Sequence, residues 1–460
     1  EITNVMGTDG IDYMFQATEG LPIDVRFMLP SCVPATPMDE SGANLDYRAI
    51  DSFYDYPRVQ GLAEMMNSYG VIHNDAEVVS KIVASQAHHK KIDGHAPGLQ
   101  GKDLDTYVAA GVYSDHECAT MEDALAKLQR GQFIMIREGT AARNLEALAP
   151  LLTPQYAERC MFCTDDKHPS DLLEKGHIDY IAREAINKYG VDPIIAVKAA
   201  CHHASRYFLL NNRGAIAPGY LADFAVIDNF KDFNVEMVFK KGVLYWNNGE
   251  LRDFEAPQIE EYLDKRAHDT FHVSTLTPDD FRDARQRGVL GMIPGEIITT
   301  DNGYADHVDL EKDILKIAVV ERHKGTHHIG LGYIQGYGLK SGAVATSISH
   351  DSHNIIVVGT NSADMAFAAN YIVEHHGGIV VVENGTVKGS VVLEIAGIMS
   401  DRPLTEVNDQ LEAAKDAAFA LGVSRGIDPF MTLSFMALPV IPKLRITTRG
   451  VVDVDTQQYV

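Results

Sequence analysis

The stretch GVYSDHECATMEDALAKLQRGQFIMIREG, residues 111–139, contains one copy of the pattern that decides the fold. A short apolar strand (111–117) leads into a helical-period segment that ends at a glycine (121–131), and a second apolar strand follows (133–139). Two strands joined by a helix are typical of a parallel βαβ unit. The stretch therefore predicts a parallel sheet.

The same alternation extends on both sides of this stretch, from residue 22 to about residue 170. Further strand candidates are IDVRFMLP (23–30), VQGLAEMM (59–66), KKIDGH (90–95) and CMFCTDD (160–166), which makes six. An open doubly wound sheet usually carries a glycine-rich phosphate loop after its first strand, and GTDG (7–10) lacks both the spacing and the preceding strand. We therefore predict an α/β fold of the (β/α)₈ TIM-barrel type, of which six units are visible.

Beyond residue 213 the pattern of expected strands and helices changes twice. Residues 214–275 begin with short alternating strands and Gly, Asn and Asp turns, and they predict a small β module of the sandwich type. Residues 276–460 contain a new alternation of strands and helices, which predicts a C-terminal α/β or α+β domain. The partial barrel then occupies residues 1–213.

The amino-acid composition excludes some classes of binding partner. The chain has 40 Lys and Arg against 64 Asp and Glu, a net charge of −24, so nucleic acid and an anionic membrane surface are not expected as partners. Five scattered cysteines do not make a disulfide framework, which favours a reducing cytoplasm. We expect a small-molecule substrate, no membrane span and a protein that forms a homo-oligomer.

Four potential metal ligands lie at or just past the carboxyl ends of strand candidates: Glu64, His95, His116 and Asp165. This is the end of a barrel at which chemistry takes place. Each residue alone could be a helix cap or a structural hydrogen-bonding group, but the four together predict a site for divalent Zn, Fe or Mn. Glu64 could bridge two metals, and Asp165 could both bind one metal and accept a proton from water.

Two weaker groups of candidates remain open between structural and functional roles. Arg137 and Glu138 lie near the end of the strand candidate 133–139 and could form an ion pair at the mouth of the site or contact the substrate. In the last region, HDSHN (350–354) precedes an apolar strand and offers a second candidate site. Its candidate side chains are those of His350, Asp351, His353 and Asn354.

Long motifs along the whole chain resemble one family. They include EITNVMG (1–7), GHAPGL (94–99), SDHE (114–117), REGTAARNLEALAPL (137–151) and SISHDSHNIIVVG (347–359). Together they resemble the bacterial adenine deaminase family of the amidohydrolase superfamily. The resemblance implies hydrolytic deamination of adenine to hypoxanthine and ammonia in purine salvage. It also implies a barrel with two divalent metals, Mn or Fe, with Zn as a further possibility.

The resemblance assigns roles to the four ligand candidates. Glu64 corresponds to the bridging carboxylate after barrel strand four, His95 and His116 to the histidines after strands five and six, and Asp165 to the aspartate after strand eight. The six visible strands are then strands three to eight. The family's H-x-H pair has no counterpart here because the chain starts at Glu1, so we expect part of a longer polypeptide or one of two associated pieces.

The expected mechanism assigns proton transfer to two carboxylates. Asp165 would take a proton from the attacking water and pass it to the departing amine. Glu117 is a candidate acid for the ring nitrogen, although neighbours in a strand, such as His116 and Glu117, face opposite ways. Two alternatives stay open: another amidohydrolase acting on a cyclic amidine or amide, and a non-catalytic scaffold with an incomplete metal site.

Overall fold

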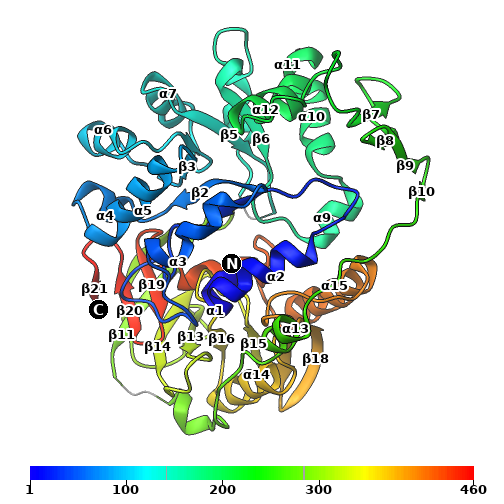
Figure 1. Cartoon of the computed structure of the whole chain (residues 1–460). Coiled ribbons are helices and arrows are strands. Elements are labelled where there is room, and N and C mark those ends of the chain that lie inside the picture. The colour runs from blue at the N-terminus through cyan, green and yellow to red at the C-terminus, as the bar shows by residue number, and fades with distance from the viewer. Residues whose placement is uncertain (141, 283–284) are drawn as a thin grey trace. The chain divides into compact units, whose positions relative to one another are not determined.

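Two units make up the chain, and each contains segments that are far apart in sequence (Figure 1). The computed structural model describes residues 1–140, 142–282 and 285–460. The parallel-strand unit consists of Ala17–Ser31 and Asp46–Gln258, and the large-sheet unit of Glu1–Gln16, Cys32–Leu45 and Ile259–Val460. The domain limits 1–213, 214–275 and 276–460 stay predictions.

All six predicted βα strands are present in the parallel-strand unit. They are β1 (Phe27–Leu29), β2 (Val59–Met65), β3 (Lys91–Gly94), β4 (Ser114–Asp115), β5 (Phe133–Arg137) and β6 (Cys160–Cys163). They form two parallel sheets, in the orders β1-β2-β3 and β4-β5-β6. A backbone hydrogen bond of 2.9 Å from Tyr113 N to Ile92 O links the segment before β4 to β3. The parallel α/β architecture is confirmed, and closure into a barrel stays a prediction.

Helices alternate with these strands, as the sequence pattern predicts. They are α3 (Tyr47–Asp51), α4 (Ser68–Ile72), α5 (Ala76–Ala87), α6 (Gly101–Ala109), α7 (Met121–Gln129), α8 (Leu145–Leu148), α9 (Pro169–Glu174), α10 (Ile178–Asn187), α11 (Pro193–Val197) and α12 (His203–Tyr207). Local chemistry sets the ends of α7. The Thr120 hydroxyl accepts from Asp123 N at 3.2 Å, and Gly131, two residues past the helix, has a φ of 88° that favours glycine.

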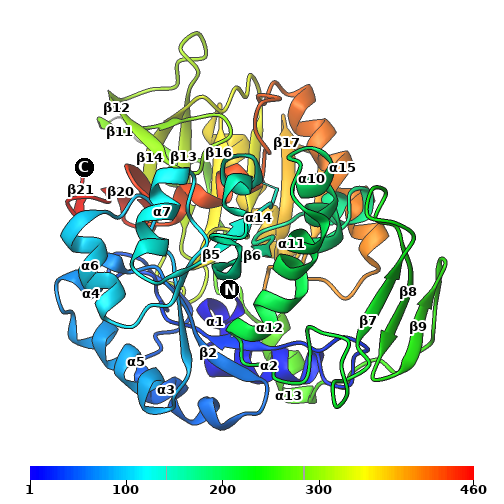
Figure 2. The same ribbon diagram turned by 90° about the horizontal axis from the view of Figure 1, so that it is seen from above.

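The small β module contains a four-stranded antiparallel sheet in the order β10-β9-β8-β7, of which β7, β8 and β9 are labelled in Figure 2. Its strands are β7 (Phe224–Ile227), β8 (Val235–Lys240), β9 (Val243–Asn247) and β10 (Glu250–Leu251). The predicted short strands are therefore present. A second sheet, which a sandwich would need, stays a prediction.

The large-sheet unit is built on eight strands in the order β12-β11-β14-β13-β16-β15-β17-β18. They are β11 (Arg287–Met292), β12 (Thr299–Ala305), β13 (Ile314–Val320), β14 (Ile329–Gln335), β15 (Ala343–Thr346), β16 (Ile355–Gly359), β17 (Gly378–Glu383) and β18 (Thr386–Val392). Neighbouring strands are antiparallel except for the parallel pair β11 and β14. This pattern is α+β, which decides between the two alternatives.

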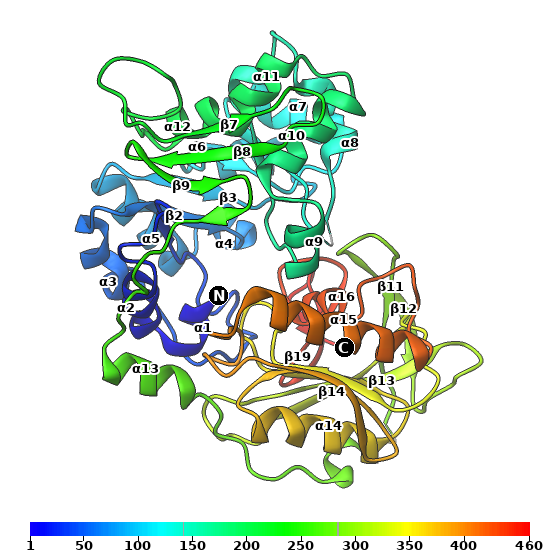
Figure 3. The same ribbon diagram turned by 90° about the vertical axis from the view of Figure 1, so that its right-hand side faces the viewer.

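Helices cover both faces of the large sheet, with α14 (Ser362–Glu374) on one side and α15 (Leu404–Ala420) on the other (Figure 3). Side chains of β13 alternate between the two cores, because successive residues of a strand point to opposite faces. Ile317 lies in the core under α15, and Ala318 lies in the core under α14. The remaining α-helices and β-strands are α1 (Ile2–Met6), α2 (Thr8–Ala17), α13 (Glu261–His268), α16 (Met431–Ser434), β19 (Leu444–Thr447), β20 (Gly450–Asp453) and β21 (Gln458–Tyr459).

Across the described residues, no helix has both the length and the apolar character that a membrane crossing requires.

Truncation of a central core side chain tests the packing of the large sheet. Ile317 is fully buried in the middle of β13, so Ile317→Ala should lower the free energy of unfolding by about 2–5 kcal/mol. Ile317→Val is the matched control and should cost only about 0.5–1.5 kcal/mol. Urea denaturation measures both. Equal stability of the two variants would contradict this packing.

Candidate metal centre

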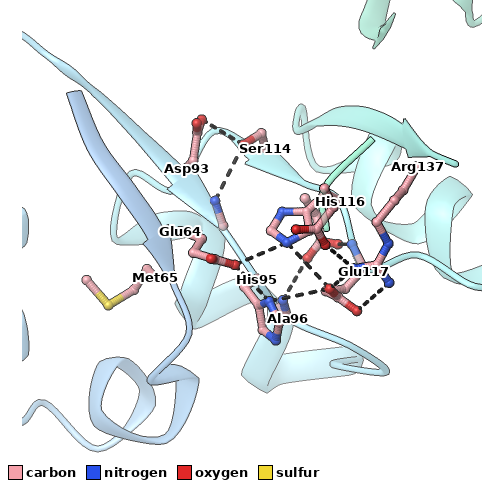
Figure 4. A network of polar contacts seen from close by, with 12 residues as sticks. Glu64, Met65, Asp93, His95, Ala96, Ser114, His116, Glu117 and Arg137 are labelled. Carbon is pink, nitrogen blue, oxygen red and sulfur yellow. Dashed lines mark hydrogen bonds and ion pairs between the residues drawn. The ribbon is translucent and has the colours of Figure 1, made fainter. Parts of the chain in front are cut away.

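Three of the predicted ligands converge at the carboxyl ends of β2, β3 and β4 (Figure 4). Glu64 Oε2 lies 3.0 Å from His95 Nδ1 and 3.1 Å from His116 Nε2. The ligand atoms of these three residues all lie within 4.8 Å of one another. The arrangement follows from parallel pairing, which brings the carboxyl ends of neighbouring strands to one edge.

A buried tyrosine joins the ends of the strands that carry Glu64 and His95. The Tyr107 hydroxyl accepts a hydrogen bond from the His95 backbone N–H at 3.0 Å and donates to the Met65 carbonyl at 2.7 Å. Tyr107 is fully buried on α6. The two ligands are thus held in register by a residue that the sequence analysis did not single out.

A buried ion pair holds the residues that directly follow both histidines. The Asp115 carboxylate accepts from Ala96 N at 2.9 Å and from Glu117 N at 2.6 Å. Lys127 Nζ lies 3.2 Å from the same carboxylate and donates to the Ala96 carbonyl at 2.8 Å. Sequence reasoning missed both members of the pair. The sequence feature that could have indicated Asp115 is its position next to His116 in the SDHE motif.

Glu117 also reaches the centre, although it is adjacent to His116. Strand β4 ends at Asp115, so the alternation of side chains along a strand does not apply to the two residues that follow. Glu117 Oε1 lies 3.5 Å from His95 Nδ1 and 3.4 Å from His116 Nε2. The objection to Glu117 in the sequence analysis is therefore removed.

Arg137, the last residue of β5, joins the two predicted catalytic carboxylates. Its Nη1 donates to Asp165 Oδ2 at 2.6 Å, and its Nη2 donates to Glu117 Oε2 at 3.0 Å. The expected ion pair between Arg137 and Glu138 is wrong, because Arg137 pairs with Glu117 and Asp165 while Glu138 Oε2 accepts from Leu145 N at 3.2 Å. Substrate contact by Arg137 or Glu138 stays a prediction.

Asp165 completes the set of four predicted ligands. It lies two residues beyond β6 with a φ of 57°, a left-handed conformation that aspartate tolerates better than most residues. Ligand atoms of His116, Glu117 and Asp165 form a second group within 4.8 Å of one another. The structure therefore brings Glu64, His95, His116, Glu117 and Asp165 into one centre.

For both Glu64 and His116, burial and the neighbouring charges shift the pKa in opposite directions. Burial raises the pKa of Glu64, but hydrogen bonds and charges from His116 and His95 outweigh it and hold that pKa well below its ordinary value. Burial lowers the pKa of His116, but Glu64, Asp165 and Glu117 together raise it to about 10. The centre therefore attracts positive charge.

The donor set fits a divalent transition metal. His95 directs Nδ1 and His116 directs Nε2 toward the Glu64 carboxylate. Two imidazole nitrogens with carboxylate oxygens suit Mn, Fe or Zn, whereas Ca and Mg prefer shells made of oxygen alone. These side chains could therefore hold such an ion.

The candidates of the HDSHN segment lie in the large-sheet unit. His350 Nδ1 lies 3.3 Å from Glu1 Oε1 and 3.5 Å from Asp351 Oδ1, and His353 Nε2 is hydrogen-bonded to Glu1 Oε2. Asn354 has a structural role instead: its Nδ2 donates to the Glu40 carbonyl at 2.6 Å and its Oδ1 accepts from Arg322 N at 3.2 Å. The sequence analysis did not connect Glu1 with this segment.

Comparison with protein families matches residues 1–245 to the amidohydrolase family and residues 296–458 to the adenine deaminase C-terminal domain. An adenine deaminase of Desulfatibacillum aliphaticivorans is 46% identical, over 100% of this chain and 81% of that protein. Adenine deaminase 2 of Carboxydothermus hydrogenoformans is 43% identical, over 99% of this chain and 80% of that protein. The chain therefore belongs to the amidohydrolase family and, within it, to the adenine deaminases.

Among solved structures, a β-aspartyl dipeptidase of Fervidobacterium islandicum resembles 45% of this chain over 62% of its own length. Its TM-score is 0.35 at 17% identity, a likeness too weak to carry an argument.

The Asp115 and Lys127 pair can be tested by removing its positive charge. Lys127→Met leaves a buried carboxylate without its cation, which should destabilise the protein by about 3–5 kcal/mol and weaken metal binding. The control is Lys188→Met at an exposed position, where both properties should stay unchanged. Urea denaturation and metal titration measure the two effects. Wild-type metal affinity in a folded Lys127→Met variant would contradict the positioning role.

Metal binding to the centre should weaken as the pH falls. A histidine must lose its proton before it binds a metal, and the raised pKa of His116, about 10, means that protons compete throughout the neutral range. The apparent affinity should therefore fall by up to about tenfold per pH unit for each proton displaced. Titration of Mn²⁺, followed by the electron paramagnetic resonance of the free ion, measures the change. A pH-independent affinity would exclude His116 as a ligand.

Proposed function

We propose that this chain carries the metal-dependent centre of an enzyme that hydrolyses adenine to hypoxanthine and ammonia in purine salvage. The convergence of Glu64, His95, His116 and Asp165 is the observation that carries the proposal. The names of relatives up to 46% identical support adenine over other cyclic amidines or amides, and they count against a non-catalytic scaffold. Adenine and water are then the substrates.

We further propose how the residues hold two divalent metals, Mn or Fe, with Zn as an alternative. His95 and His116 would hold one ion, Glu64 would be shared between the two ions, and Asp165 would contribute a carboxylate oxygen. When bound, divalent ions lower the pKa of water, so that a hydroxide is available near neutral pH. The strands β1 to β6 would be strands three to eight of a (β/α)₈ barrel. Homo-oligomerisation and a cytoplasmic location stay predictions from composition.

Adenine C6 is an electron-poor ring carbon that carries an amine. Its hydrolysis needs a nucleophilic hydroxide, a proton for the ring nitrogen and a proton for the departing ammonia. In this proposal Asp165 takes one proton of the attacking water and delivers it to the departing amine. Glu117 donates a proton to the ring nitrogen and takes back the remaining hydroxyl proton as the C6 carbonyl forms. The contacts of Arg137 with both carboxylates support a positioning role for its guanidinium.

Replacement of Asp165 tests the proton-transfer role. Asp165→Asn keeps the size and one oxygen of the side chain, so metal content should stay largely intact while turnover falls by about 10²–10⁴-fold. The neighbouring variant Asp166→Asn is the control and should stay active. Ammonia release from adenine and elemental analysis measure the two properties. Unchanged turnover would remove Asp165 from the mechanism.

Replacement of Arg137 separates positioning from substrate binding. Arg137→Lys keeps a positive charge but loses the paired donors that hold Glu117 and Asp165 together. We expect kcat to fall by about tenfold or more while KM for adenine changes little. A rise in KM with kcat unchanged would instead assign Arg137 to substrate binding.

A further inference from the structure

The loop between β15 and β16 in the large-sheet unit is unusually polar for a buried segment. It spans residues 347–354, and seven of its eight residues are polar and buried. Loops with polar side chains normally lie at the surface, because a buried polar group costs free energy unless it has a partner. The exception is Ile348, which is half-buried. Such a loop needs partners for its polar groups.

Two side chains of this loop and Glu1 bring ligand atoms together. Glu1 Oε1 lies 3.3 Å from His350 Nδ1, and Asp351 Oδ1 lies 3.5 Å from the same nitrogen. The ligand atoms of the three residues lie within 4.8 Å of one another. The side chains of His350 and Asp351 are 7% and 11% exposed, whereas that of Glu1 is 48% exposed, so the group is buried on the loop side and open to solvent on the Glu1 side.

A third carboxyl group, from a separate segment, lies beside this cluster. Asp39 is 6% exposed; its Oδ1 accepts from Glu40 N at 2.9 Å, and its carboxyl group also hydrogen-bonds to Ser352 of the loop. Burial raises the pKa of Asp39 to about 7, and the charge of Asp351 contributes to this shift, so the two carboxyls lie within electrostatic range. A buried carboxyl group this close to Asp351 is available as a further ligand for a cation.

His353 has a different role in the cluster. Its Nδ1 accepts a hydrogen bond from the Ser349 backbone N–H at 3.3 Å. Its Nε2 therefore carries the proton and donates it to Glu1 Oε2. A histidine with both nitrogens engaged in this way orients the carboxylate and does not bind the ion itself.

We propose that Glu1, His350 and Asp351 bind a divalent transition-metal ion, with Asp39 as a fourth group. One imidazole and several carboxylates favour Mn²⁺, Fe²⁺ or Zn²⁺. The ligands differ entirely from those of the centre at Glu64, and the proposal does not rest on the adenine deaminase activity. The ion would join the residue that precedes α1, the segment Cys32–Leu45 and the loop 347–354, three parts of the large-sheet unit that are distant in sequence.

The test uses the purified protein loaded with Mn²⁺ and counts bound ions by elemental analysis after gel filtration. Asp351→Asn and His350→Asn should each lose one equivalent of Mn²⁺ relative to the wild type. His376→Asn, at an exposed turn, is the matched control and should lose none. Wild-type stoichiometry in folded His350→Asn and Asp351→Asn variants would overturn the proposal.

A second variant keeps the test decisive if those changes prevent folding. The double variant Glu64→Gln, His116→Asn removes ligands of the other centre and leaves the proposed site intact. We expect it to retain one equivalent of Mn²⁺, and the ion should raise its Tm in a way that ethylenediaminetetraacetate reverses. A folded double variant without bound Mn²⁺ would overturn the second site. Loss of adenine turnover in that variant would concern the proposed function and would not count for or against the second site.

Discussion

The salt bridge between Asp115 and Lys127 is the interaction on which the candidate centre depends. Both side chains are fully buried, and their charges and hydrogen bonds are directed at the backbone just after His95 and His116. A buried ion pair contributes little net stability by itself, but removal of one partner leaves a charge in a medium that solvates it poorly. The pair thus couples correct folding of the strand ends to the geometry of the ligands.

A second layer of polar contacts surrounds the ligands. Arg137 ties Glu117 to Asp165, and Tyr107 ties the end of β2 to the end of β3. Each contact joins two neighbouring strands or the loops that follow them. The side chains of the centre are therefore held before any metal binds, which lowers the cost of ordering them when it does.

The two units use histidine and carboxylate pairs in different settings. In the parallel-strand unit the ligands follow successive parallel strands, whereas in the large-sheet unit His350 and Asp351 lie in one loop between antiparallel strands. Glu1, which directly precedes α1, contacts the second cluster from more than 300 residues away in sequence. The proposed ion there would serve to hold segments together, while the ions at Glu64 would serve chemistry.

The sequence by itself determined the six βα strands, the four metal-ligand candidates and the family, because hydrophobic period, strand ends and long motifs are local properties. It left open whether the C-terminal domain is α/β or α+β, because strand direction depends on pairing between distant segments. Only the tertiary structure paired Arg137 with Glu117 and Asp165, connected Lys127 with Asp115, and brought Glu1 to His350. Such pairings are decided by burial, because a charge that leaves water must find its partner wherever the folded chain places one.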